Sequence, residues 1–304
     1  MAKKGQIAII GAGPAGLTAA IYTARAGLAT VVLGNPYDSQ VAKLGVIENY
    51  PGFAEGIQGL ELIEAMENQA KANNVEVIYE QVISIESIDD GFSLKTEEDE
   101  TIEAKSIILA MGSRYRKIRI PGEEEFYAKG VSYCAVCDGA LYQGKNTVVV
   151  GYGTGAAKAA VYLSNISPKV YLICPKKELG AEAIYEDRLN EKDNIEVHYL
   201  ARVKEILGEE FVEKVHFKEK GEIKEIKTEG VFIEYGTVPN TVLAEQIGVQ
   251  VDEKGFIMTN SETLETNVPG VFAAGDVRGQ IRQIATAVGD GCITSYGVQK
   301  YLGE

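Results

Sequence analysis

The sequence of 304 residues contains no tryptophan, two histidines, four cysteines and no apolar run of the roughly 18 residues that a membrane-spanning helix needs. Only Cys134 and Cys137 are close together, and both histidines lie far from them, which argues against a metal site and against a secreted disulfide framework. The net charge of −14 argues against a nucleic-acid-binding protein, because phosphate contacts need clustered Lys and Arg. We therefore expect no metal, no nucleic acid and no membrane among its ligands and partners.

The N-terminus resembles a signal peptide only superficially. Lys3 and Lys4 precede an apolar stretch, but residues 11–16 read G-A-G-P-A-G, and Gly-Pro would break the helix of a signal peptide at its centre. A short strand that enters a glycine turn is the better interpretation. Together with a single Cys-x-x-Cys, this indicates a redox protein of a reducing compartment, and we expect a cytoplasmic location.

The first part of the sequence follows the plan of a dinucleotide-binding unit. Apolar residues 7–10 predict a buried strand, the glycine turn occupies 11–16, a helix is predicted over 17–26, and the next strand over 30–33. In such a unit the glycines let the backbone approach a pyrophosphate at the N-terminus of the helix. An ordinary glycine-rich turn is the alternative.

The same plan returns near the middle of the chain. A strand is predicted over 147–150, G-Y-G-T-G-A follows at 151–156, a helix over 157–163 and a strand over 170–173. The first glycine precedes the second strand by 19 residues in both copies. The matched spacing predicts two related domains, although the second glycine motif is the weaker of the two.

Near the C-terminus, residues 271–276 read V-F-A-A-G-D and predict a strand that ends in a carboxylate. Ligands of open α/β sheets bind at the carboxyl ends of the strands, where Asp276 can accept hydrogen bonds from ribityl or ribose hydroxyls. Read alone, Asp276 is equally compatible with a surface turn.

With these motifs in this order, the sequence resembles the low-molecular-weight thioredoxin reductase family of flavoproteins over essentially its whole length. The resemblance also rests on I-E-N-Y-P-G at 47–52, A-M-G at 110–112, S-Y-C-A-V-C-D-G at 132–139 and R-Q-I-A at 282–285. It implies an α/β fold of two Rossmann-like, three-layer (ββα) dinucleotide-binding domains, the second inserted into the first. The FAD domain would comprise 1–113 and 243–304, the inserted domain 114–242, and the enzyme would be a homodimer that reduces thioredoxin.

The resemblance implies the residues of both sites. The glycine turn would face the FAD pyrophosphate, Asp276 the ribityl chain and residues 283–285 the flavin ring. Cys134 and Cys137 would form the redox-active pair. The FAD contacts are Gly11, Gly13, Pro14, Ala15, Gly16, Gln40, Asn49, Ala110, Gly112, Gly275, Asp276, Gln283, Ile284 and Ala285.

The Cys-x-x-Cys chemistry needs a proton donor. Two cysteines at this spacing can close a small disulfide ring, and a helix that starts at the pair lowers the pKa of a thiol. The nearest histidine in sequence, His198, is more than sixty residues away. Asp138 is therefore the expected acid, although it can equally be a helix-capping residue. Inert structural thiols are the alternative for the pair, and we expect Cys174 and Cys292 to be small buried side chains.

The second glycine motif departs from the family pattern. Most members follow the strand with His-Arg-Arg and a further Arg that clasp the 2′-phosphate of NADPH, but here residues 174–180 read C-P-K-K-E-L-G. Lys176 is a point charge and does not replace bidentate arginines. Cys174 stands at the position where an acidic residue would bind the ribose of NADH. The FAD copy also lacks an acidic residue there, because Gly34 occupies the equivalent position. Tyr152 adds a large ring to the turn.

Some family members that lack this signature take electrons from ferredoxin, and this sequence resembles them in what it has lost. Acidic ferredoxins need a basic surface, which R-Y-R-K-I-R at 114–119 provides, with Arg278 and Arg282 expected nearby. Solvated charges on a linker are the alternative. We expect FAD as the cofactor, thioredoxin as the substrate and ferredoxin as the electron donor.

Two other functions remain open, and the sequence counts against a third. The same disulfide reductase could use NADH or NADPH as its donor. A non-catalytic FAD-binding redox sensor or scaffold is a third reading, which the intact C-A-V-C-D at 134–138 disfavours. A ferredoxin–NADP oxidoreductase of related fold would lack the cysteine pair.

Overall fold

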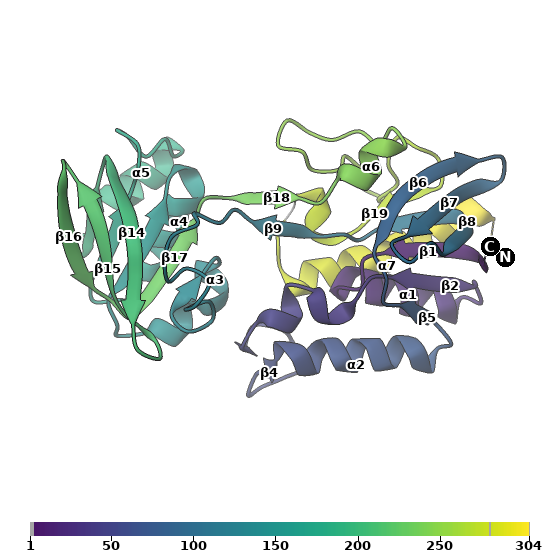
Figure 1. Ribbon diagram of the computed structural model, residues 1–304, viewed down its shortest axis with the longest axis horizontal. Coiled ribbons are helices and arrows are strands. Elements are labelled where there is room, and N and C mark those ends of the chain that lie inside the picture. Colours follow the sequence, from purple (N-terminus) through teal and green to yellow (C-terminus); the bar gives the residue numbers. More distant parts are fainter. Residues whose placement is uncertain (1–2, 280, 304) are drawn as a thin grey trace. The chain divides into compact units, whose positions relative to one another are not determined.

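The computed structural model describes residues 3–279 and 281–303. The chain forms two compact units, one made of Met1–Arg114 and Val238–Glu304 and the other of Tyr115–Thr237. Strands β9 (Ser113–Tyr115) and β18 (Thr237–Pro239), at the two crossings, pair in a two-stranded sheet (Figure 1). The second unit is therefore an insertion into the first.

The first unit is built on a sheet with the strand order β5-β2-β1-β8-β7-β6, in which β19 also pairs with β8. The pairs β1–β2, β1–β8, β2–β5 and β8–β19 are parallel, whereas β6–β7 and β7–β8 are antiparallel. The strands are β1 (Lys3–Ile10), β2 (Thr30–Leu33), β5 (Glu76–Ile78), β6 (Val82–Ile88), β7 (Gly91–Thr96), β8 (Thr101–Leu109) and β19 (Val271–Ala273).

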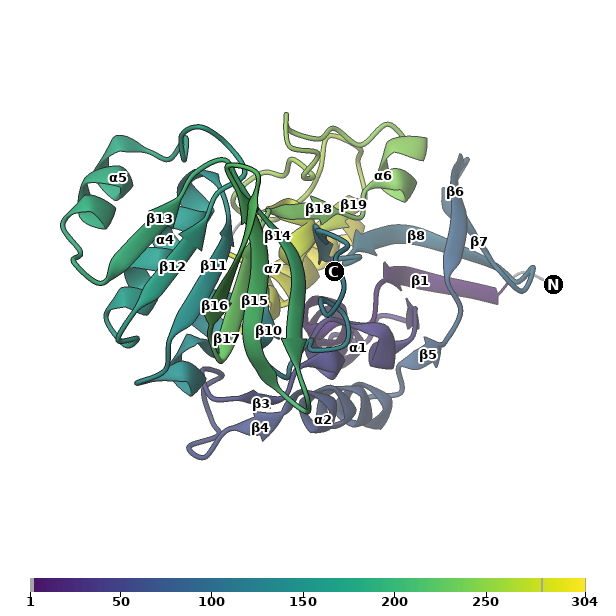
Figure 2. The same ribbon diagram turned by 60° about the vertical axis from the view of Figure 1, so that its left-hand side comes forward.

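Strand β1 shows why this sheet has two buried faces. Ile7 and Ile9 join one hydrophobic cluster, and Ala8 and Ile10 join another, because successive side chains of a strand point to opposite faces. The first cluster lies under helices α1 (Pro14–Arg25), α2 (Gly59–Ala72) and α7 (Ile284–Leu302), and Figures 1 and 2 show α1 and α2 on the same side of the sheet. The second is closed by β6, β7 and α6 (Val242–Gln246).

The second unit has the same three layers. A parallel sheet of order β10-β17-β11-β12-β13 carries Val149 and Leu172 toward the helices, and Val148 and Val150 toward the antiparallel sheet β14-β15-β16. The elements are β10 (Val131–Ser132), β11 (Thr147–Gly151), β12 (Val170–Ile173), β13 (Ile195–His198), β14 (Ala201–Gly208), β15 (Val212–Glu219), β16 (Glu222–Lys227), β17 (Gly230–Glu234), α4 (Gly153–Ser164) and α5 (Ala183–Asn190).

Short elements complete both units. They are η1 (Pro36–Asp38), η2 (Val41–Lys43), β3 (Val46–Ile47), β4 (Ile57–Gln58), α3 (Ala135–Asp138), η3 (Gly139–Tyr142) and η4 (Gly275–Arg278). Within residues 3–279 and 281–303, no helix is both long and apolar enough to span a membrane. The predicted fold class, α/β with two Rossmann-like domains of which one is inserted, is confirmed.

Candidate active site

The glycines of the first glycine turn lack a side chain for two different reasons. A Cβ on Gly11, which has φ +110°, would lie 2.3 Å from the carbonyl oxygen of Ala110, and a Cβ on Gly16 would lie 1.9 Å from the carbonyl oxygen of Gly11. A Cβ on Gly13 would have its nearest described neighbour, Ser39, at 4.0 Å. Gly11 and Gly16 therefore serve close packing, and Gly13 leaves room at the N-terminus of α1, where an anion is favoured.

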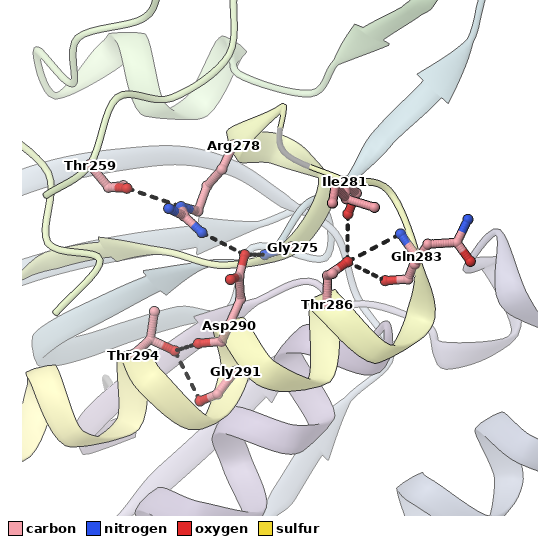
Figure 3. Close-up of polar contacts among 9 residues, drawn as sticks. All are labelled: Thr259, Gly275, Arg278, Ile281, Gln283, Thr286, Asp290, Gly291 and Thr294. Carbon is pink, nitrogen blue, oxygen red and sulfur yellow. Dashed lines mark hydrogen bonds and ion pairs between the residues drawn. The ribbon is translucent and has the colours of Figure 1, made fainter. Parts of the chain in front are cut away.

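Residues that are far apart in sequence meet beyond this turn. The Gln40 side-chain amide donates to the carbonyl oxygen of Ser113 at 2.5 Å, and Asn49 Nδ2 donates to Oε1 of Gln283 at 3.3 Å. Gln283 is also the N-cap of α7, in a capping box with Thr286 (Figure 3). Two of the predicted flavin contacts, Asn49 and Gln283, thus touch one another, and half-buried Ile284 and exposed Ala285 follow Gln283 in α7.

The segment that follows β8 has two features that suit a polar ligand. Ser113 Oγ is buried and makes no well-formed hydrogen bond to any described residue, although it lies close enough to Asp276 to lower the pKa of that carboxyl. A buried hydroxyl without a partner is costly unless a ligand satisfies it. A Cβ on Gly112, at φ +64°, would meet no described atom within 4 Å. These residues fit FAD, whose hydroxyls and pyrophosphate need such donors and such space.

Asp276 lies in η4, which follows β19, so the predicted carboxylate stands close to the end of a strand. Burial raises its pKa, and the positive charge of Arg282 opposes that shift. The preceding Gly275 packs against α1, since a Cβ on it would lie 3.0 Å from the Cβ of Ala15. The structure therefore brings Asp276 to the same end of the sheet as the glycine turn and Ala110.

Arg278 corrects one prediction. The sequence suggested that it joins Arg282 on a basic docking surface, but its side chain is only 10% exposed and forms an ion pair with Asp290 at 2.7 Å (Figure 3). Its Nε donates to the Thr259 hydroxyl at 3.0 Å. Arg282 is exposed. Asp290, which sequence reasoning missed, is an acidic residue in an otherwise largely apolar helix, and that contrast was its one signal.

The two predicted redox cysteines form a disulfide. Cys134 and Cys137 are bonded, with their Cα atoms 5.3 Å apart, and both are partly exposed. Cys134 is the N-cap of α3, and its sulfur accepts the backbone N–H of Cys137 at 3.2 Å. A backbone donor at this sulfur favours the negative charge that a thiolate would carry after reduction.

The carboxyl of Asp138 is held beside the disulfide by Ser132. The Ser132 hydroxyl donates to Asp138 at 2.6 Å and accepts the backbone N–H of Cys134 at 3.0 Å. Burial raises the pKa of Asp138, and the hydrogen bond from Ser132 opposes this rise. A carboxyl with a raised pKa keeps its proton to a higher pH than usual, so Asp138 can hold a proton next to the disulfide and deliver it. Ser132 was not predicted as a site residue.

The second glycine turn differs from the first in what surrounds it. A Cβ on Gly151 would lie 2.3 Å from the carbonyl oxygen of Glu234, and one on Gly155 would lie 3.5 Å from a carboxylate oxygen of the same residue. The Tyr152 ring packs edge-on against Tyr235, with centroids 5.5 Å apart, and the Lys176 ammonium lies 3.8 Å from its centroid. A carboxylate therefore borders the turn at which a pyrophosphate would bind.

The remaining predicted residues are placed as follows. Arg114, Arg116 and Arg119 are exposed, and Lys117 forms an ion pair with Glu124 at 2.5 Å. Cys174 is fully buried as predicted, and it donates weakly to the Glu178 carbonyl at 3.7 Å. Cys292, in α7, is half-buried rather than buried.

Known proteins resemble this chain over nearly its whole length. Residues 5–291 match the family described as pyridine nucleotide-disulphide oxidoreductase. Thioredoxin reductase of Bacillus subtilis (strain 168) is 42% identical over 310 residues, which cover 98% of this chain and 95% of that one. NADPH-dependent thioredoxin reductase 3 of Arabidopsis thaliana is 38% identical over 308 residues, which cover 97% of this chain and 58% of that one.

A solved structure agrees with these relatives. Thioredoxin reductase from Streptococcus pyogenes MGAS5005 superposes with a TM-score of 0.93 at 39% identity, and the match covers 100% of this chain and 99% of that one. The predicted resemblance is thus confirmed at the level of the family. The chain belongs to the low-molecular-weight thioredoxin reductase family of pyridine nucleotide-disulphide oxidoreductases, whose cofactor is FAD.

Proposed function

We propose that the chain is a thioredoxin-disulfide reductase that passes two electrons from FAD to the Cys134–Cys137 disulfide and on to thioredoxin. The observation that carries this proposal is the disulfide itself, which opens α3 beside the buried carboxyl of Asp138. Relatives named thioredoxin reductase support the choice of thioredoxin as substrate. A non-catalytic sensor would need neither a proton donor nor a partly exposed disulfide.

The residues of the redox loop have distinct tasks. FAD, when bound, supplies the electron pair that, with two protons, converts the disulfide into two thiols. The Cys134 thiolate, favoured by the N–H of Cys137, then attacks one sulfur of the partner disulfide and forms a mixed disulfide, and the other partner sulfur leaves as a thiolate. Cys137 attacks the mixed disulfide, which restores the Cys134–Cys137 bond and releases the second partner sulfur. Asp138 donates a proton to a leaving thiolate.

For the electron donor we propose ferredoxin, which would deliver its electrons one at a time. Features of the second glycine turn and of residues 114–119 support this choice. The Glu234 carboxylate beside the second glycine turn repels a pyrophosphate, and Lys176 packs over the Tyr152 ring. Exposed Arg114, Arg116 and Arg119 provide positive charge for an acidic protein.

NADPH or NADH is the second candidate donor, and a specific observation favours it. A Cβ on Gly153, at φ +77°, would meet no described atom within 4 Å, so the N-terminus of α4 has the room that a dinucleotide needs. The Arabidopsis relative is named NADPH-dependent. Exposed Lys176 and Lys177 are then the charges available for a 2′-phosphate.

Anaerobic bleaching of the flavin absorbance separates these donors. NADPH, NADH and chemically reduced ferredoxin are added in turn to the FAD-loaded protein, and thioredoxin is added afterwards. Bleaching by ferredoxin, reversed by oxidised thioredoxin, is the expected result. Rapid bleaching by NADPH or NADH would reject the ferredoxin proposal and keep the reductase. Bleaching that thioredoxin does not reverse would reject the reductase itself.

We further propose a homodimer in the cytoplasm. The homodimer is implied by the family resemblance, and the cytoplasmic location is inferred from the single Cys-x-x-Cys, which suits a reducing compartment. Sedimentation equilibrium of the FAD-loaded protein tests the first proposal, and a single monomeric species would contradict it. Fractionation of the source cells tests the second.

A further inference from the structure

A partly buried ion pair lies beside the predicted ribityl-binding turn. Arg278, at the end of η4, and Asp290, in the second turn of α7, are 10% and 16% exposed and are joined at 2.7 Å (Figure 3). The same Asp290 oxygen accepts the backbone N–H of Gly275 at 2.9 Å. One carboxylate oxygen therefore holds both ends of the four-residue η4, with Asp276 between them.

The surroundings leave this turn little freedom. Gly275 has φ +77°, and a Cβ on it would press on Ala15 at 3.0 Å. Thr259 accepts the Nε–H of Arg278 from the opposite side, as Figure 3 shows. The position of Asp276 is thus set from α7 through Asp290 and from the segment around Thr259 through Arg278.

The pair also sets the charge near Asp276. The negative charge of Asp290 is felt at Asp276, where it raises the pKa of that carboxyl, and Arg282 acts in the opposite direction. Arg278 and Asp290 together are neutral. Loss of either one leaves an unmatched, partly buried charge close to Asp276, the predicted FAD contact.

We propose that Arg278 and Asp290 are positioning residues for FAD: their ion pair fixes the Gly275–Asp276 turn against the cofactor and keeps the local charge neutral. This inference rests on the proposed FAD contact of Asp276. A purely structural ion pair is the competing interpretation, and it predicts changes in protein stability alone.

Two charge-neutralising variants separate the interpretations, because they should move the flavin midpoint potential in opposite directions. Asp290→Asn keeps an oxygen for the Gly275 N–H but leaves the charge of Arg278 unmatched, which favours added electrons and raises the potential. Arg278→Gln leaves the charge of Asp290 unmatched and lowers it. The double variant restores neutrality, so its potential should return toward that of the unaltered protein.

Binding of FAD to the apoprotein gives a second readout that does not depend on activity. Asp290→Ala removes the acceptor for the Gly275 N–H as well as the charge, and we expect the dissociation constant of FAD to rise about tenfold or more. Asp99→Asn is the matched control, because it breaks an exposed ion pair with Lys95 in the same unit. The control should change neither the potential nor the affinity.

Three outcomes would overturn the proposal. The first is that the potentials of both single variants stay unchanged, the second is that they shift in the same direction, and the third is that only the melting temperatures fall. If Asp290→Ala fails to fold, the comparison of Asp290→Asn with the double variant remains decisive. If the unaltered protein bound no FAD, the assignment of the cofactor site would fail first, and the measurement distinguishes that case from failure of the ion-pair proposal.

Discussion

Ser132 and Asp138 are joined by a hydrogen bond of 2.6 Å, and the same Ser132 oxygen accepts the backbone N–H of Cys134. The hydroxyl thus ties the proposed acid to the first redox cysteine. Because this bond favours the ionised carboxylate, it lowers the pKa of Asp138 against the rise that burial causes. The proposed acid, Asp138, is therefore positioned by Ser132, a residue outside the Cys-x-x-Cys motif.

Ser132→Ala should shift the pH dependence of thioredoxin reduction. Without the hydroxyl, the pKa of Asp138 rises further, so the carboxyl stays protonated to a higher pH. The limb of the rate profile that depends on protonated Asp138 should move to higher pH in single-turnover exchange between the reduced enzyme and thioredoxin. Ser87→Ala, on a strand of the FAD unit, is the control. A profile that keeps its shape and position in Ser132→Ala would contradict the assignment of Asp138 as the acid.

Cys137→Ser should stop the reaction at the mixed disulfide. Cys134 carries the favoured thiolate, because it accepts the N–H of Cys137, and a serine at 137 retains that N–H. The variant should form a covalent adduct with thioredoxin through Cys134, which mass spectrometry detects, and turnover should fall by about a thousandfold or more. FAD binding should be unchanged. An adduct that forms instead in Cys134→Ser, through Cys137, would reverse the two roles.

The sequence predicted two of the strands more closely than the helix starts, although β1 begins at Lys3, four residues before the predicted range 7–10. Strands β2 and β12 coincide with the predicted ranges 30–33 and 170–173, because each is a short apolar run at a buried position. Helices α1 and α4 begin three and four residues before the predictions, at Pro14 and Gly153. Glycine has low helix propensity, so a helix that starts inside a glycine turn is hidden from a propensity argument.

Residues of the candidate site could be predicted where they belong to one sequence motif. They could not be predicted where only the packing of distant elements brings them together. Cys134, Cys137 and Asp138 stand together in one motif. The pairing of Arg278 with Asp290 depends on how η4 meets α7, and Glu234 reaches the second glycine turn because β17 pairs with β11. Neither contact leaves a periodic pattern in the sequence, since each depends on tertiary structure.

Glu234→Gln tests the electrostatic barrier at the second glycine turn. Removal of the carboxylate charge should make the turn more favourable to a pyrophosphate, and we expect flavin bleaching by NADPH to accelerate about tenfold, as loss of roughly 1.4 kcal/mol of repulsion would give. Glu213→Gln, an exposed residue of the same unit, is the control. A slower NADPH reaction in Glu234→Gln would mean that the carboxylate binds the nucleotide, for instance at a ribose hydroxyl.

Replacement of Arg114, Arg116 and Arg119 by glutamine tests the donor surface. All three side chains are exposed, so the triple variant removes charge with little effect on packing. The rate of bleaching by reduced ferredoxin should fall about tenfold at low salt and should lose much of its salt dependence. Bleaching by dithionite reports the flavin without a docked partner and should be unaffected. An unchanged ferredoxin rate would show that these arginines are solvated charges of the linker.

Asp276→Asn should make the apoprotein more stable near neutral pH while it weakens FAD binding. Burial raises the pKa of Asp276 in the folded chain, so the unfolded chain ionises first as the pH rises, and the folded state loses relative stability between the two pKa values. Asparagine has no such loss. The gain in melting temperature over the unaltered apoprotein should therefore be present near pH 7. It should be absent below about pH 3, where the Asp276 carboxyl is protonated in both the folded and the unfolded chain. A gain of equal size at both pH values would show that Asp276 is ionised no differently in the folded and unfolded chains. Such a result would contradict the argument that the Asp276 carboxylate destabilises the folded apoprotein and is needed for FAD binding instead.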